Sequence, residues 1–151
     1  MTATQTVSGG ITKNKYETKQ FQLGDNEIVG NQTHTAGGTD SVLPNFLLMG
    51  QVAATRKLVP LAPTATDGSQ YPYGFLWLGL EASKTVATTV TDATLACIIK
   101  GKVDAGLISL PSGVTLNDIP TINGTISSGR TVREFLNDRG ITLVEASNLL
   151  Y

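Results

Sequence analysis

The sequence predicts a mainly β protein with one short C-terminal helix (α+β), in which a compact body follows an extended N-terminal arm. Three observations support this prediction. From residue 42 onward, short apolar stretches alternate with turn residues, which is typical of a β-rich body. Residues 131–140 carry the start and stop signals of a helix. Residues 1–40 contain only isolated large apolar side chains, too few to form a core.

We therefore assign the arm to residues 1–40 and the body to residues 41–151. Thr, Gln, Asn, Gly and Lys dominate the arm, and such a chain can pair its backbone with a strand of another protein. At about 3.3 Å per residue, the extended arm would span on the order of 100 Å. The alternative is a disordered tail without a partner. The residues that we expect to contact a partner are Ile11, Tyr16, Phe21 and Leu23.

The strands of the body are predicted from four apolar stretches, at residues 46–49, 57–59, 73–80 and 94–103. Three prolines, at positions 60, 63 and 72, exclude a central strand between residues 61 and 73, which we interpret as a surface loop. The dipeptide Asn123-Gly124, between short β-compatible stretches, predicts a hairpin with a two-residue turn.

The helix is predicted from its caps. Thr131 can cap the first turn, and Glu134 three residues later completes a capping box. Gly140 supplies the left-handed stop, and residues 141–144 then read as a closing strand. A helix of about two turns does not persist alone in water, so its apolar face must pack against the sheet. That face consists of Val132, Phe135 and Leu136.

The composition excludes several classes of protein. The chain has 151 residues, a net charge of -1 and 15% charged residues, without a run of Lys or Arg, so we expect no nucleic-acid partner. Cys97 is the single cysteine, which rules out an internal disulfide and a cysteine-based zinc site. Low charge combined with abundant Thr and Gly favours contacts with other proteins over an isolated, highly charged monomer.

We find no constellation of catalytic residues, and the sequence predicts neither an enzyme nor a cofactor, metal or small-molecule substrate. His34 is the single histidine; we interpret it as a solvated loop residue. The acidic pair Asp25 and Glu27 lies in a polar stretch, where carboxylates stay solvated. Gly101-Lys102 lacks the remaining residues of a phosphate-binding loop. Cys97 lies among apolar residues and is interpreted as a small buried side chain.

The N-terminus has neither a basic start nor an apolar stretch, and the longest apolar run, residues 75–80, is interrupted by Gly79. We therefore expect no secretion signal and no contact with a membrane. Synthesis in the cytoplasm, where a lone cysteine stays reduced, is the corresponding expectation.

Four segments of the body resemble, in order and spacing, the bacteriophage lambda-type head decoration protein family. They are RKLVPLAPTATDGS at residues 56–69, YGFL at 73–76, IKGKV at 99–103 and VREFLNDRGITLVEA at 132–146. The resemblance covers residues 40–146. It implies a fold of the β-clip type, a homotrimer, and binding to the three-fold and quasi-three-fold sites on the outer surface of an expanded capsid. It also implies that the arm adds a strand to the major capsid protein and so stabilises the head against the pressure of the DNA.

Two other functions are weighed against this one. A small nucleotide hydrolase of the dUTP pyrophosphatase type shares the β-clip architecture, and VDAGL at residues 103–107 is similar to one of its motifs. The residues that follow lack the aromatic residue and the Arg-Gly of that site, and a C-terminal glycine-rich phosphate motif is absent from the sequence. A carbohydrate-binding adhesion module would use exposed aromatic side chains, for which the candidates are Tyr71, Tyr73 and Trp77.

Overall fold

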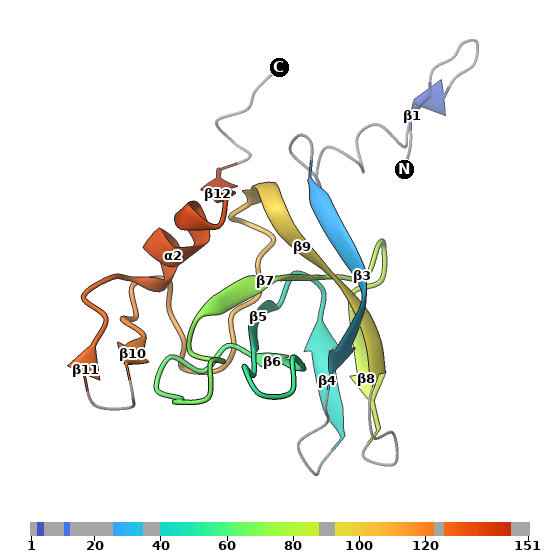
Figure 1. Cartoon of the computed structure of the whole chain (residues 1–151). Helices are drawn as coiled ribbons and strands as arrows, with labels where there is room; N and C mark the ends of the chain where they lie inside the picture. The colour runs from blue at the N-terminus through green and yellow to red at the C-terminus, as the bar shows by residue number, and fades with distance from the viewer. Residues whose placement is uncertain are drawn as a thin grey trace.

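The computed structural model describes residues 26–34, 40–87, 93–122 and 126–145, and the backbone of two short strands in the arm (Figure 1). These two strands are β1 (Ala3–Thr4) and β2 (Ile11–Thr12), which pair in parallel. The prediction of a mainly β protein with a short helix near its C-terminal end is confirmed. The elements of the body are β3 (Glu27–His34), β4 (Ser41–Pro44), β5 (Leu48–Gln51), β6 (Leu58–Pro60), β7 (Pro72–Trp77), β8 (Ser83–Val86), β9 (Ala93–Asp104), β10 (Thr121–Ile122), β11 (Ile126–Ser127), α2 (Val132–Asp138) and β12 (Ile141–Val144).

The long strand β9 organises the six-stranded sheet, whose order is β12-β9-β3-β6-β5-β7. β9 pairs antiparallel with β3 and with β7, and its last four residues pair in parallel with β12. Strands from both ends of the body therefore meet on β9. Two further pairs of strands, β4 with β8 and β10 with β11, lie outside this sheet and form antiparallel ribbons.

Apolar side chains cover both faces of the sheet. Phe75 and Ile98 belong to one core cluster, which also contains the buried residues of α2 and β12. Leu76 and Cys97, their neighbours in β7 and β9, belong to a second cluster on the opposite face. Successive side chains of a strand point to opposite faces. A strand that is buried on both faces therefore needs the unbroken apolar runs found in the sequence.

The predicted helix and the strand after it are confirmed. The Thr131 side chain accepts a hydrogen bond from the Glu134 backbone N–H, and the Glu134 carboxylate accepts one from the Thr131 backbone N–H, so the capping box is complete. Val132 and Leu136 are fully buried against the sheet. Gly140 has a φ of 84°, the left-handed conformation expected at the end of the helix.

Two loop predictions are confirmed with modifications. β10 and β11 form the predicted hairpin, but Ile122 pairs with Ile126, so the turn has three residues instead of two; residues 123–125 lie outside the described part of the chain. Residues 61–71 connect β6 to β7 as a loop, yet Leu61, Ser69 and Gln70 are buried. The loop packs on the body because its polar groups form local hydrogen bonds. For example, the Asp67 carboxylate accepts a hydrogen bond from the Ser69 hydroxyl.

Residues 27–34, which the composition of the sequence assigns to the arm, form β3 of the main sheet. The interpretation of His34 as a solvated loop residue is wrong: only 2% of it is exposed, and its Nδ1 lies 2.8 Å from the Leu58 carbonyl oxygen. This stretch has few apolar residues of its own. Its neighbours β9 and β6 supply the apolar surroundings through long-range pairing.

Among the described residues, no helix has the length and the apolar character needed to cross a membrane.

Candidate attachment and assembly surfaces

Of the arm residues predicted to contact a partner, one lies in a described strand and three lie outside the described residues. Ile11 is in β2, whose backbone alone is described, and Tyr16, Phe21 and Leu23 lie outside the described residues. In β3, the first strand of the main sheet in chain order, Glu27 lies directly opposite Lys100 of β9. Opposite charges at such a position stabilise the pairing of two strands.

Two segments, the loop at residues 61–66 and the described part of residues 111–128 (111–122 and 126–128), form what we call the charge-poor surface. Asp118 is its single charged residue, and the Asp118 carboxylate accepts hydrogen bonds from the backbone N–H and the hydroxyl of Thr115, both at 2.8 Å. The two loops are in contact, because the Thr121 backbone N–H donates to the Pro63 carbonyl oxygen at 3.0 Å. Depletion of charge is the compositional mark of the centre of a protein–protein interface.

Exposed apolar side chains are concentrated on this surface. The described residues include five large apolar side chains that are exposed: Val42, Leu80, Ile119, Ile122 and Ile126. Three of the five lie in the short segment at residues 119–126, and none of the residues of β10 and β11 is buried. The β10–β11 ribbon thus presents its isoleucines to solvent and has no core of its own.

A pocket of about 500 Å³ opens beside the ribbon, between residues 61–64 and 111–114, and Asp118 and Ile119 complete its wall. Apart from Asp118, its lining consists of uncharged side chains, among them Leu61, Pro111 and Val114. Such a pocket can receive apolar side chains of a partner.

Hydrogen bonds join the base of the ribbon to the start of α2. The backbone N–H of Ser128 donates to the Pro120 carbonyl oxygen at 2.9 Å, and that of Val132 donates to the Asp118 carbonyl oxygen at 2.8 Å. The N–H groups in the first turn of a helix have no partner within the helix. Here the Val132 N–H holds the charge-poor surface against α2, so that the base of the ribbon lies next to the start of the helix.

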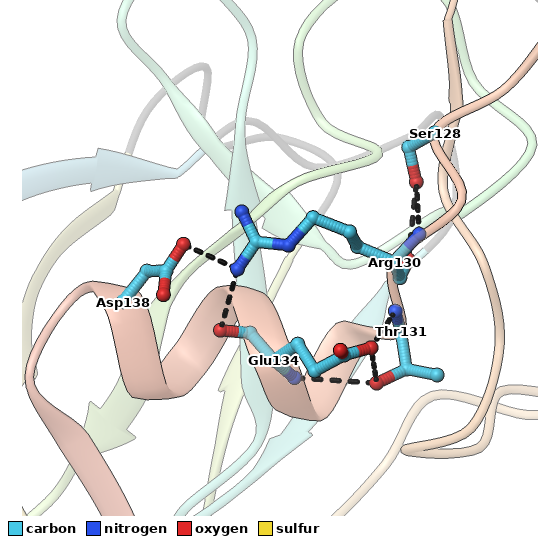
Figure 2. Close-up of polar contacts among 5 residues, drawn as sticks. All are labelled: Ser128, Arg130, Thr131, Glu134 and Asp138. Carbon is cyan, nitrogen blue, oxygen red and sulfur yellow. Dashed lines mark hydrogen bonds and ion pairs between the residues drawn. The ribbon is translucent and has the colours of Figure 1, made fainter.

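Charged side chains on the outer side of α2 stabilise this junction (Figure 2). Arg130 forms an ion pair with Asp138 and donates to the Glu134 carbonyl oxygen at 3.4 Å. The Ser128 hydroxyl donates to the Arg130 carbonyl oxygen at 3.0 Å. Hydrogen bonds that the Glu134 carboxylate accepts lower its pKa below the usual value. The Thr131 backbone N–H has the larger effect and the Thr131 hydroxyl the smaller one. The cap is therefore charged at neutral pH, next to the ribbon.

The aromatic residues considered for carbohydrate binding pack against other side chains of the protein. Each of them is partly buried. Two of them pack against another aromatic ring, with the distance measured between ring centroids, and the third lies under a guanidinium, with the distance measured from the guanidinium carbon to the ring centroid. The pairs are Tyr71 with Phe135 (5.1 Å), Tyr73 with the guanidinium of Arg139 (5.2 Å) and Trp77 with Phe46 (5.8 Å).

Cys97 is fully buried, and burial raises the pKa of its thiol to about 12. The thiol is therefore protonated at neutral pH and unreactive, which confirms its interpretation as a small buried side chain. In the described ranges, we find no group of three or more His, Cys, Asp or Glu side chains that could hold a metal ion.

Comparison with known proteins agrees with the resemblance found in the sequence. No curated protein matches the chain. The family model for the bacteriophage lambda head decoration protein D matches residues 11–122, a range that begins in the arm and extends through the body to β10. The match covers more than half of the chain, and the chain therefore belongs to the bacteriophage lambda head decoration protein D family.

Proposed function

We propose that this head decoration protein binds as a trimer to the three-fold and quasi-three-fold sites on the outer surface of the expanded capsid. There it cements the shell of the major capsid protein against the internal pressure of the DNA. The observation that carries the proposal is the family match at residues 11–122, which includes part of the arm as well as most of the body. The proposed role is structural and requires no catalytic group.

Preferential binding to the assembled shell explains how such a protein stabilises a capsid. A protein that binds the assembled state and not the dissociated state shifts the equilibrium toward assembly by mass action. A trimer carries three arms, and once the first arm is bound the others bind at a high effective concentration. A modest contact for each arm is then sufficient for slow dissociation.

We propose that the segment that makes this contact is shorter than residues 1–40. Because β3 belongs to the main sheet, we assign the free arm to residues 1–25, which span about 80 Å when extended. Ile11, Tyr16, Phe21 and Leu23 all lie within it. We propose that they occupy apolar sites on the major capsid protein while the arm backbone pairs with one of its strands.

We propose further that the three chains of the trimer associate with one another through the charge-poor surface. A partner with many charges would lose the hydration of those charges without gaining ion pairs, because this surface offers only Asp118. A second copy of the same surface is matched in charge. The isoleucines of the β10–β11 ribbon and the neighbouring pocket provide complementary shapes on one molecule, as an association that closes into a ring requires.

Sedimentation with empty capsids tests the attachment. Purified protein is mixed with expanded, undecorated shells of the phage that encodes it, and the bound fraction is measured after pelleting. We expect saturable binding at micromolar protein. A variant that lacks residues 1–25 should bind more weakly and keep the oligomeric mass of the full chain. Absence of the full-length protein from the pellet would contradict the proposed function.

A further inference from the structure

The strand β12 forms the one open edge of the six-stranded sheet in the described part of the chain. β7 pairs with both β5 and β9, and β3, β5 and β6 each lie between two other strands. These strands therefore have a neighbour on either side, whereas β12 pairs with β9 alone. The other side of β12 carries backbone N–H and C=O groups that no strand of this sheet uses.

Two hydrogen bonds show which groups of β12 point away from β9. The Gly101 backbone N–H donates to the Gly140 carbonyl oxygen at 3.0 Å. The Ala105 backbone N–H donates to the Val144 carbonyl oxygen at 2.8 Å. The N–H and the C=O of one strand residue point to the same side, and successive residues alternate between the two sides. Leu143, which is partly exposed, therefore directs both of its backbone groups to the open side.

The open edge lacks common guards against pairing with another chain. Exposed edges in proteins are often blunted by charged residues, by proline or by a bulge. β12 has the sequence ITLV, without a charge or a proline, and its register with β9 is regular. Ile141 is fully buried, so the accessible part of the edge begins at Leu143 and continues to the exposed Glu145. An accessible edge of this kind can accept an added strand.

A lysine on the exposed face beside this edge indicates the charge of the added strand. Lys102 of β9 lies directly opposite Thr142 of β12, and both residues are exposed. Within the described ranges, the Lys102 ammonium group has no hydrogen bond and no ion pair. Side chains at paired positions point to the same face, and a strand added to β12 would lie about 10 Å from β9. An acidic side chain next to Thr142 would therefore come within reach of Lys102 and stabilise the added strand.

The open edge lies where the arm meets the body. Asn26, the residue before β3, lies against Gly101, and Gly101 pairs with Ile141 of β12. β12 and the start of β3 are at the same end of the molecule (Figure 1). We infer that an extended segment of the major capsid protein, with an acidic side chain facing Lys102, adds to the sheet as a strand beside β12. This inference rests on the proposed function, in which the arm attaches the same end of the body to the shell.

Residue-resolved hydrogen exchange of the wild-type chain, free and on shells, tests the added strand. In the free protein, the Val144 amide should be protected, because it points toward β9, and the Leu143 amide should exchange rapidly. On decorated shells, the Leu143 amide should exchange at least about tenfold more slowly, and the Val144 amide should stay protected. Protection of Leu143 in the free protein would mean that another segment or a second copy covers the edge. That result, or rapid exchange of Leu143 on shells, overturns the inference.

A pair of charge reversals tests the chemistry of the added strand. Lys102→Glu should bind undecorated shells about tenfold more weakly, because it places a carboxylate next to the acidic side chain of the partner. Lys84→Glu is the matched control and should bind like the wild type. Lys84 is an exposed lysine of β8, a strand that lies toward the opposite end of the molecule from β12 (Figure 1). Equal binding by the two variants overturns the inference.

The wild-type chain separates failure of this inference from failure of the proposed function. If the wild-type chain does not bind shells, the proposed function fails together with the inference. If it binds shells and the Leu143 amide still exchanges rapidly, only the inference fails.

Discussion

The two ribbons outside the six-stranded sheet, β4–β8 and β10–β11, are attached to the body in different ways. Leu43 of β4 and Val86 of β8 are buried in the second core cluster, so side chains anchor this ribbon. None of the residues of β10 and β11 is buried, and hydrogen bonds, instead of packed side chains, hold the base of this ribbon to the loop at Pro63 and to the start of α2. The ribbons lie on different sides of the molecule (Figure 1).

This difference shows that an exposed apolar residue has meaning only in its context. Val42 is 63% exposed and Ile126 is 62% exposed. Val42 is the outer residue of a strand whose next residue is buried, as expected for a ribbon with one solvent face. Ile126 pairs across its ribbon with another exposed isoleucine, Ile122. Only the β10–β11 ribbon therefore needs cover from outside, and this supports its proposed place in an interface.

The largest expected effect is the loss of a core anchor. Leu43→Ala should lower the free energy of unfolding by about 2–4 kcal/mol, because it leaves a cavity beneath the β4–β8 ribbon. Ile126→Ala should change it by no more than about 0.5 kcal/mol when the protein is dilute enough to be monomeric. Urea unfolding followed by circular dichroism measures both values. Similar losses in the two variants would contradict the distinction between the ribbons.

A charge on each ribbon sharpens the comparison at the level of assembly. Ile126→Asp should weaken association of the copies about tenfold or more, because it places an unpaired charge in the proposed interface. Val42→Asp is the matched control, since its position is equally exposed, and it should associate like the wild type. Light scattering over a concentration series measures the mass, which for a trimer is three times the 15.9 kDa of one chain. Equal masses for the two variants would exclude the charge-poor surface as the interface.

A smaller effect is expected from the cap that joins the β10–β11 ribbon to α2. Thr131→Ala removes the side-chain acceptor of the Glu134 N–H and should destabilise the protein by about 1 kcal/mol. Thr142→Ala, at an exposed position of β12, serves as the control and should have a smaller effect. Thermal unfolding measures both variants. A loss no larger than that of the control would mean that the capping box does not stabilise the junction.

The smallest effect is the pH dependence of the same cap. Because the pKa of Glu134 is lowered in the folded protein, its contribution to stability is present above its unfolded pKa of about 4.3 and is lost as the pH falls through the folded value. Glu134→Gln keeps a similar shape without the titration. The unfolding midpoints of wild type and Glu134→Gln should differ at pH 7 and converge as the pH falls below the folded pKa of Glu134. A constant difference across this range would contradict the assignment.

Local signals in the sequence account for the parts that were predicted. The capping box, Gly140 and the closing strand could be recognised because their residues interact with near neighbours. β3 and the burial of His34 were missed, since a strand with few apolar residues is recognisable only from the strands beside it. The charge-poor stretch could be recognised in the sequence, where Asp118 is its single charge. That it forms one surface with residues 61–66 depends on contacts far apart along the chain.

The sequence by itself determined the β-rich class, the place of the helix, the scarcity of catalytic groups and the family, because each depends on residue types in a local order. Only the tertiary structure decided which apolar residues are anchors and which are exposed, that residues 27–34 belong to the main sheet, and that Asn26 lies against Gly101 of β9. These properties depend on which distant segments β9 brings together. Pairing between distant strands is selected by the packing of the whole core, and no short stretch of sequence encodes it.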